Sequence, residues 1–139
     1  MTGTAETVRA RRRVLIVDDE VQNLDTFRRV WRRDYEIATA ASGAAGLELL
    51  AGREFDVVLT DFGMPGMNGS AFVQVARQTQ SVAIVMITGY IDKPEVRELE
   101  QTGALFSVVG KPWDRKTIID VIERASEHTD AIRAQAPAR

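Results

Sequence analysis

Cysteine is absent from this 139-residue chain, which excludes a disulfide framework and a thiolate metal site. No apolar stretch approaches the roughly 20 residues that span a bilayer. The N-terminus, Met1-Thr2-Gly3-Thr4, lacks the apolar segment of a signal peptide. Internal repeats and low-complexity segments are also missing. These absences predict a cytoplasmic protein with no membrane partner.

The chain also lacks a large excess of charge of either sign. Eighteen basic and 20 acidic residues give a net charge of −2, which argues against direct nucleic-acid binding by the domain as a whole. Lysine is rare, with Lys93, Lys111 and Lys116 standing beside fifteen arginines (18 basic residues minus three). The length and the 45% hydrophobic content suit one globular domain with a single core.

Four short apolar runs share one feature, a polar signature at the carboxyl end. They are 14–17 before Asp18-Asp19, 55–60 before Asp61, 82–87 before Thr88, and 105–109 before Gly110-Lys111-Pro112. Short β-branched runs bounded by turn residues are typical of strands buried on both faces, as in a parallel sheet.

The segments between these runs predict a fifth strand and the helices of an α/β protein. The additional strand is expected over 35–39, and helices over 20–33, 44–51, 70–79, 94–102 and after Asp114. Five strand–helix repeats predict a doubly wound parallel sheet, with the flavodoxin-like strand order 2-1-3-4-5. We expect this domain over 12–127, a flexible basic tail over 1–11, and a frayed helix end or tail over 128–139.

Three acids are expected to meet at the carboxyl edge of the sheet. Asp18 and Asp19 end the first strand and Asp61 ends the third, and these strands are neighbours in the predicted order. Carboxylates this close repel and raise one another's pKa values unless a cation lies among them. Mg²⁺ suits a surface crevice with few oxygen ligands. The alternative for the pair, capping of the following helix, requires one acid and not two.

Asp61 is the candidate nucleophile. An apolar strand precedes it and a glycine-rich loop, 62–69, follows it, which leaves one carboxylate exposed at the sheet edge. Such a carboxylate can form an acyl phosphate, whereas the simpler interpretation is a turn residue.

Lys111 and Thr88 are candidate ligands for a phosphate group. A lysine ammonium suits a phosphate oxygen, and a cis bond before Pro112 would aim Lys111 inward. Followed by Gly89, Thr88 is read as a hydroxyl presented at a strand end. The competing interpretations are an exposed loop lysine and a threonine chosen for its β propensity.

Taken together, these motifs resemble the receiver domain of two-component response regulators over about 12–127. The matching segments are Val17-Asp18-Asp19, Asp61 with Met64-Pro65-Gly66-Met67-Asn68-Gly69, Thr88-Gly89 and Lys111-Pro112-Trp113. Each is weak alone, but their order and spacing together are specific.

The resemblance implies a (βα)₅ receiver in which Asp61 accepts a phosphoryl group from a histidine kinase or a phosphotransfer protein. It implies that Asp19, Asp61 and the backbone carbonyl of Gly63 bind Mg²⁺ directly, and that Asp18 acts through water. Thr88 and Lys111 would bind phosphate oxygens and take part in the phosphorylation reaction.

The resemblance also implies what the domain does after phosphorylation. It would switch a surface toward a downstream protein or output domain, with a homodimer possible through helix 4, strand 5 and helix 5. It would catalyse only its own phosphorylation and dephosphorylation, and so would not be an enzyme in the ordinary sense.

One position departs from the family pattern. Receivers usually carry Tyr or Phe three residues before the lysine, where this chain has Val108. Phe106 is expected on the same strand face by the period of two. We expect the loop from Thr88 to Pro94 to move on phosphorylation, and Trp113 to lie partly exposed at the edge of the responding surface.

Three other functions share parts of this pattern. A flavin mononucleotide binder would want a Ser/Thr/Gly loop after the first strand, where this chain has two acids. An aspartyl phosphatase would want acid, any residue, acid, but Glu20 follows Asp18-Asp19. A phosphorylation-independent interaction module would usually have lost an acid or the lysine, and neither is lost.

Overall fold

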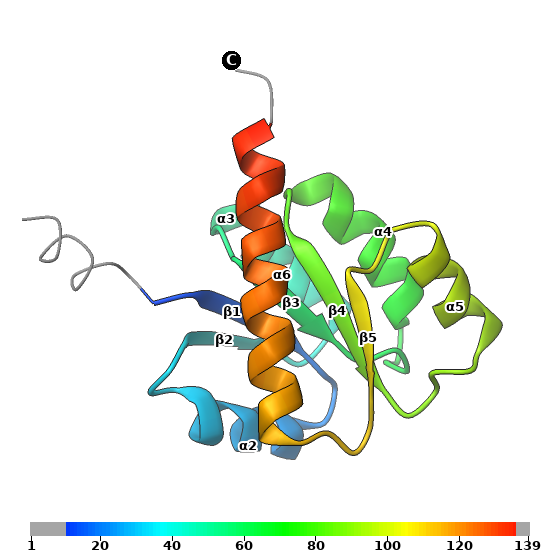
Figure 1. Ribbon diagram of the computed structural model, residues 1–139. Helices are drawn as coiled ribbons and strands as arrows, with labels where there is room; N and C mark the ends of the chain where they lie inside the picture. Colours follow the sequence, from blue (N-terminus) through cyan, green and yellow to red (C-terminus); the bar gives the residue numbers. More distant parts are fainter. Residues whose placement is uncertain (1–10, 136–139) are drawn as a thin grey trace, which may run out of the picture.

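A computed structural model of the protein describes residues 11–135 (Figure 1). The parts of the expected tails at 1–10 and 136–139 lie outside the described residues. One five-stranded parallel sheet in the order β2-β1-β3-β4-β5 confirms the predicted flavodoxin-like fold. The strands are β1 Arg13–Val17, β2 Glu36–Ala40, β3 Val57–Thr60, β4 Ala83–Thr88 and β5 Ser107–Gly110. The helices are α2 Val21–Trp31, α3 Gly43–Gly52, α4 Gly69–Thr79, α5 Pro94–Gln101 and α6 Arg115–Gln135.

The strands alternate between two apolar layers, as the period of two requires. In β1, Val14 and Ile16 pack in the layer under α2 and α6, and Leu15 and Val17 pack in the layer under α3, α4 and α5. Figure 1 shows α6 lying across one face of the sheet. Because both faces are covered, the polar ends of the strands remain the part of the sheet open to ligands.

Local polar residues set where the helices begin. The side chains of Ser42 and Asn68 accept hydrogen bonds from Ala45 N and Ala71 N, and these bonds cap α3 and α4. Asp114 accepts from Thr117 N at 2.8 Å, as the sequence predicted for the last helix.

The helix α6 continues to Gln135. The prediction that the chain frays from residue 128 is therefore wrong for residues 128–135. Thr129 is fully buried; its hydroxyl accepts from Ala83 N at 2.9 Å and donates to Asp56 O at 2.7 Å. Arg133 donates to two backbone carbonyls just before β3 and β4. These polar side chains satisfy backbone groups at the amino edge of the sheet, and this anchors the extra turns. Within residues 11–135, no helix is both long and apolar enough to cross a membrane.

We expect Thr129→Val to lower the free energy of unfolding by about 1–3 kcal/mol, because it leaves a buried N–H and a buried carbonyl unpaired. Urea denaturation measures the change. Thr102→Val is the matched control, because Thr102 is exposed and its hydroxyl bonds only Leu99 O at a helix end. Equal stability of the two variants would contradict the anchoring of α6 through Thr129.

Candidate phosphoryl and metal site

The pairing of β1 with β3 brings the acids together. Val17 is in register with Thr60, so Asp18 and Asp61 leave the sheet side by side, and Asp61 N donates to Val17 O at 3.1 Å. Oxygen atoms of Asp18, Asp19 and Asp61 all lie within 4.8 Å of one another. The expected gap of a few ångströms between the carboxylates is confirmed.

Asp18 is buried and already partnered. It is 8% exposed, and its carboxylate accepts from Glu20 N at 2.9 Å and from Asn23 Nδ2 at 3.2 Å. The role of Asn23 did not emerge from the sequence. The sequence did show an asparagine in the first turn of the helix that follows the two acids. Whether its side chain points toward them depends on the rotation of α2 about its axis, which the sequence does not give.

Lys111 faces the same carboxylates. Its Nζ lies 3.7 Å from Asp61 Oδ1 and 4.0 Å from Asp18 Oδ2, and the Lys111–Pro112 bond is cis. Asp61 Oδ1 also accepts from Phe62 N at 2.8 Å. One oxygen of Asp61 therefore accepts a backbone hydrogen bond and also lies in an ion pair with Lys111.

The pKa of Asp61 is raised above its ordinary value, and burial is the main cause. The Lys111 ammonium and the Phe62 N–H offset part of the rise, and the charges of Asp18 and Asp19 add to it. Repulsion between the acids, the cause named from the sequence, is thus the smaller contribution.

The loop after Asp61 folds back tightly, as its glycines predicted. A Cβ on Gly69 would lie 2.5 Å from Asp61 O and 2.7 Å from Phe62 Cα, so only glycine fits there. Gly66 has φ +81°, in the region that favours glycine. Gly63 is exposed, and Met64 is buried in the core.

Thr88 ends β4 but is fully buried. Its hydroxyl accepts from Tyr90 N at 3.0 Å, and its carbonyl accepts from Lys111 N at 3.1 Å. The Tyr90 side chain packs edge-on against Phe62, with ring centroids 6.2 Å apart, and Lys93 Nζ lies 5.3 Å from the Tyr90 ring centroid. Thr88 therefore holds the loop that places Tyr90 against Phe62, the residue after Asp61.

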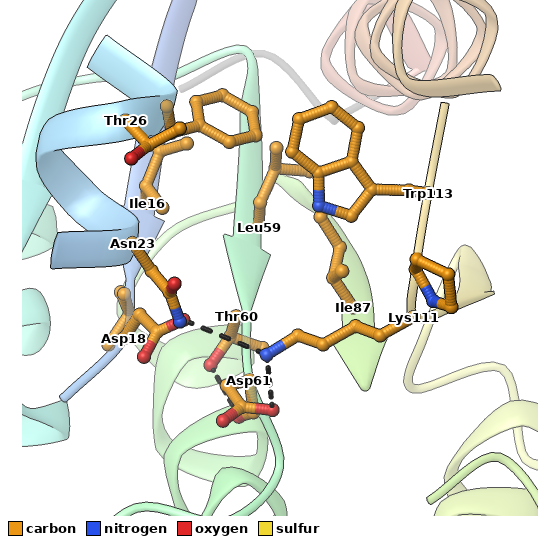
Figure 2. Close-up of a pocket in the computed structure, with 13 residues that line it drawn as sticks. Ile16, Asp18, Asn23, Thr26, Leu59, Thr60, Asp61, Ile87, Lys111 and Trp113 are labelled. Atoms are coloured by element: carbon orange, nitrogen blue, oxygen red, sulfur yellow. Dashed lines mark hydrogen bonds and ion pairs between the residues drawn. The ribbon is translucent and has the colours of Figure 1, made fainter. Parts of the chain in front are cut away.

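A cavity of about 510 Å³ opens beside Asp61 (Figure 2). Its polar lining includes Asp18, Asn23, Asp61 and Lys111, and Thr88 is not part of its wall. The cavity is large enough for a metal ion, a phosphoryl group and more.

The residues near β5 differ from expectation in one respect. Val108 packs in the layer under α3, α4 and α5, but Phe106 packs in the opposite layer, with its ring 5.0 Å from that of His128. Phe106 precedes the strand, which begins at Ser107, so the period of two does not extend to it. Trp113 is half-buried and contacts Phe27, with ring centroids 5.9 Å apart.

Parallel strands that present three acids and a lysine at one edge define an α/β protein with a site suited to a divalent cation and a phosphoryl group. The profile of the response regulator receiver domain family matches residues 14–123. The chain belongs to this family, whose members are signalling domains of two-component systems and not metabolic enzymes.

Several proteins are similar to this chain. The hydrogenase transcriptional regulatory protein HoxA of Cupriavidus necator is 29% identical over 115 residues, which are 82% of this chain and 24% of HoxA. The crystal structure of an adenylate cyclase from Rhodopirellula baltica has a TM-score of 0.85 and 29% identity, covering 90% of this chain and 94% of that chain. The receiver domain of the sensor histidine kinase PA1611 from Pseudomonas aeruginosa, with magnesium in its active-site cleft, has a TM-score of 0.76 and 20% identity, covering 85% and 99%.

The chain spans about a quarter of the length of the transcriptional regulators it matches. The similarity is therefore to the receiver portion of longer proteins, and their remaining parts have no counterpart in the match.

We expect Asp61→Asn to raise the free energy of unfolding of the metal-free protein at neutral pH by on the order of 1 kcal/mol. A raised pKa means that the ionised carboxylate costs more in the folded state than in the unfolded state. The gain should be small below the ordinary aspartate pKa and should grow as pH rises through the raised one. Denaturation across pH 3–7 measures it.

Asp114→Asn serves as the control with opposite electrostatics. The hydrogen bond from Thr117 N lowers the pKa of Asp114, so removing this charge should bring no gain in stability at neutral pH. The same pH-dependent gain in both variants, or none in Asp61→Asn, would contradict the burial of charge at Asp61.

Proposed function

We propose that this receiver accepts a phosphoryl group on Asp61 from a partner histidine kinase or phosphotransfer protein, in a Mg²⁺-dependent relay. The observation that carries the proposal is the placement of Asp61, with two carboxylates within 4.8 Å and the Lys111 ammonium at 3.7 Å. Phosphoryl transfer needs a nucleophile, anionic groups that bind a cation, and a fixed positive charge that binds phosphate. Asp61 is the half-buried nucleophile, and the neighbouring carboxylates and Lys111 supply the other two.

The donor set fits Mg²⁺, because three carboxylates in a small crevice are hard oxygen ligands. We assign direct contacts to Asp19, Asp61 and the Gly63 carbonyl, and a water-mediated contact to Asp18, whose oxygens already accept from Glu20 and Asn23. When bound, the ion would neutralise charge on the phosphoryl group. The magnesium described in the PA1611 receiver supports this assignment.

Asp61, Lys111 and Thr88 have different roles in the proposed phosphoryl transfer. Asp61 Oδ1 accepts from Phe62 N and pairs with the Lys111 ammonium, which leaves Oδ2 to attack phosphorus as the bond from the donor nitrogen to phosphorus breaks. The Lys111 ammonium binds one phosphate oxygen. Thr88 binds another, and to do so its hydroxyl turns toward the phosphoryl group and changes its contact with Tyr90 N.

This exchange at Thr88 gives the signal a route out of the site. The loop from Thr88 to Pro94 would move, because one of its anchors is the Thr88 hydroxyl. Val108 has no ring that could follow, and Phe106 lies in the other layer. Output would then depend on this loop and on Trp113, whose contact with Phe27 links the end of the site to α2.

The partners follow from this role. We propose that the switched surface contacts a downstream protein or an output domain, with homodimerisation through α5, β5 and α6 as one form of output. We propose a cytoplasmic location, because the partner histidine kinase needs ATP to form its phosphohistidine. The receiver would catalyse its own phosphorylation and dephosphorylation and no other reaction.

Incubation with acetyl phosphate and Mg²⁺ should label the wild-type protein stoichiometrically, and Asp61→Asn should abolish the label without loss of fold. Intact mass and circular dichroism measure both. Asp25→Asn, an exposed acid on α2 outside the site, should label normally. Continuous turnover would indicate a phosphatase, and a wild type that never labels would indicate a phosphorylation-independent interaction module.

Asp19→Ala should weaken Mg²⁺ binding at least about tenfold and slow phosphorylation with it, because a ligand of the ion is lost. Lys111→Ala should slow phosphorylation while leaving Mg²⁺ affinity equal or tighter, since a nearby positive charge is removed. Titration followed by amide chemical shifts around Asp61 measures the affinity. An unchanged dissociation constant in Asp19→Ala would remove Asp19 from the ligand set.

Tyr90→Ala should shorten the lifetime of the phosphorylated form about threefold, which corresponds to roughly 0.7 kcal/mol in the barrier. The Tyr90 ring packs beside Gly63 and Phe62 and limits the approach of water. Phosphate release measures the decay, with Ile91→Ala as the control for the exposed neighbour. Equal decay in wild type and Tyr90→Ala would show that the ring does not shield the site.

A further inference from the structure

The cavity beside Asp61 is larger than the proposed phosphorylation requires. Its volume is about 510 Å³. A Mg²⁺ ion with its waters and one phosphoryl group need the space of roughly eight water molecules, about 240 Å³. At least about half of the cavity thus remains for something else, since Asp19, Gly63 and Thr88 do not line it. The whole cavity lies in the size range of small-molecule sites.

The remaining half is apolar and lies along the face of the sheet under α2 and α6. Its wall is formed by Ile16, Phe27, Leu59, Ile87 and Trp113. Figure 2 shows Trp113 at the opposite end from Asp18 and Asp61, with Leu59 and Ile87 between. The edge-to-face pair of Phe27 and Trp113 forms an aromatic corner, against which a flat ring packs well.

The other end of the cavity is negatively charged. Asp18 and Asp61 face it with one ammonium, that of Lys111, and Asp19 lies within 4.8 Å of both acids. A ligand that spans the cavity therefore needs a ring at one end and a positive charge at the other.

We propose that this cavity binds small arylalkylammonium compounds. The ring packs against Phe27 and Trp113, the short alkyl chain crosses Leu59 and Ile87, and the ammonium group lies beside Asp18. Because the Asp18 carboxylate lies within 4.8 Å of the acids that we assign to Mg²⁺, the ammonium group and the ion would repel each other, and the two bind in competition. The binding is independent of the proposed phosphorylation, but a bound amine would hold the receiver in its metal-free form.

Three probes separate the contributions of ring and charge in the metal-free protein: 2-phenylethylamine, 2-phenylethanol and ethylamine. Followed by ¹H–¹⁵N NMR, 2-phenylethylamine should bind at least about tenfold more tightly than the other two, a difference of about 1.4 kcal/mol. The Trp113 indole signal should shift. Saturating Mg²⁺ should weaken the amine at least tenfold. Equal affinity for all three probes, shifts confined to another region, or indifference to Mg²⁺ would overturn the proposal.

A pair of matched variants tests the place of the ring. Thr26 is exposed on α2 and lines the cavity. Thr26→Phe should therefore fill the end of the cavity near Phe27 and Trp113, and should weaken the binding of 2-phenylethylamine at least about tenfold. Gln22→Phe adds the same ring one turn earlier, at an exposed position outside the cavity wall, and should leave the affinity within about twofold. Wild-type affinity in a folded Thr26→Phe protein would overturn the proposal.

A further variant tests the place of the charge. Asp18→Asn should weaken 2-phenylethylamine at least about tenfold and leave 2-phenylethanol unaffected. Equal loss for both probes would show that the substitution disturbs the cavity and not an ammonium contact, which would contradict the proposed position. Labelling of wild-type protein by acetyl phosphate, measured without amine, reports on the proposed function separately.

Discussion

The parallel pairing of β1 with β3 is the constraint on which the rest of the site depends. Because Val17 is in register with Thr60, Asp18 and Asp61 follow the two strands as neighbours, although their negative charges repel. Burial then raises the pKa of Asp61, so the metal-free site is held in place at an electrostatic cost. The apolar layers on both faces of the sheet offset that cost, because slipping the register by one residue would turn every strand side chain to the wrong face.

The surrounding parts reduce this cost by supplying donors. Lys111 faces two of the carboxylates, Phe62 N holds Asp61, and Glu20 N with Asn23 holds Asp18. The same donors fix which oxygens remain free for a cation or a phosphoryl group. Stability and function are thus opposed at this edge, as is common where a fold holds charges together for chemistry.

Much of the fold and the acid cluster followed from the sequence, because parallel strands place their carboxyl ends at one edge. Asp18, Asp61 and Lys111 could be assigned to one site from strand ends alone. Asn23 could not, since its aim depends on the rotation of α2. Phe106 was assigned to the wrong layer because the strand begins at Ser107, two residues after the expected start. Thr129 and Arg133 were read as tail residues, since nothing local shows that their polar groups bond to the distant edge of the sheet.

We propose that Asp61 carries the phosphoryl group, and the chemistry of acyl phosphates tests this assignment directly. Borohydride reduces an aspartyl phosphate to homoserine, so reduction of the phosphorylated protein, proteolysis and peptide sequencing by mass spectrometry identify the acceptor. We expect homoserine at position 61 and unmodified aspartate at positions 18 and 19. Homoserine at position 18 or 19, or a phosphorylated protein whose Asp61 survives reduction unchanged, would contradict it.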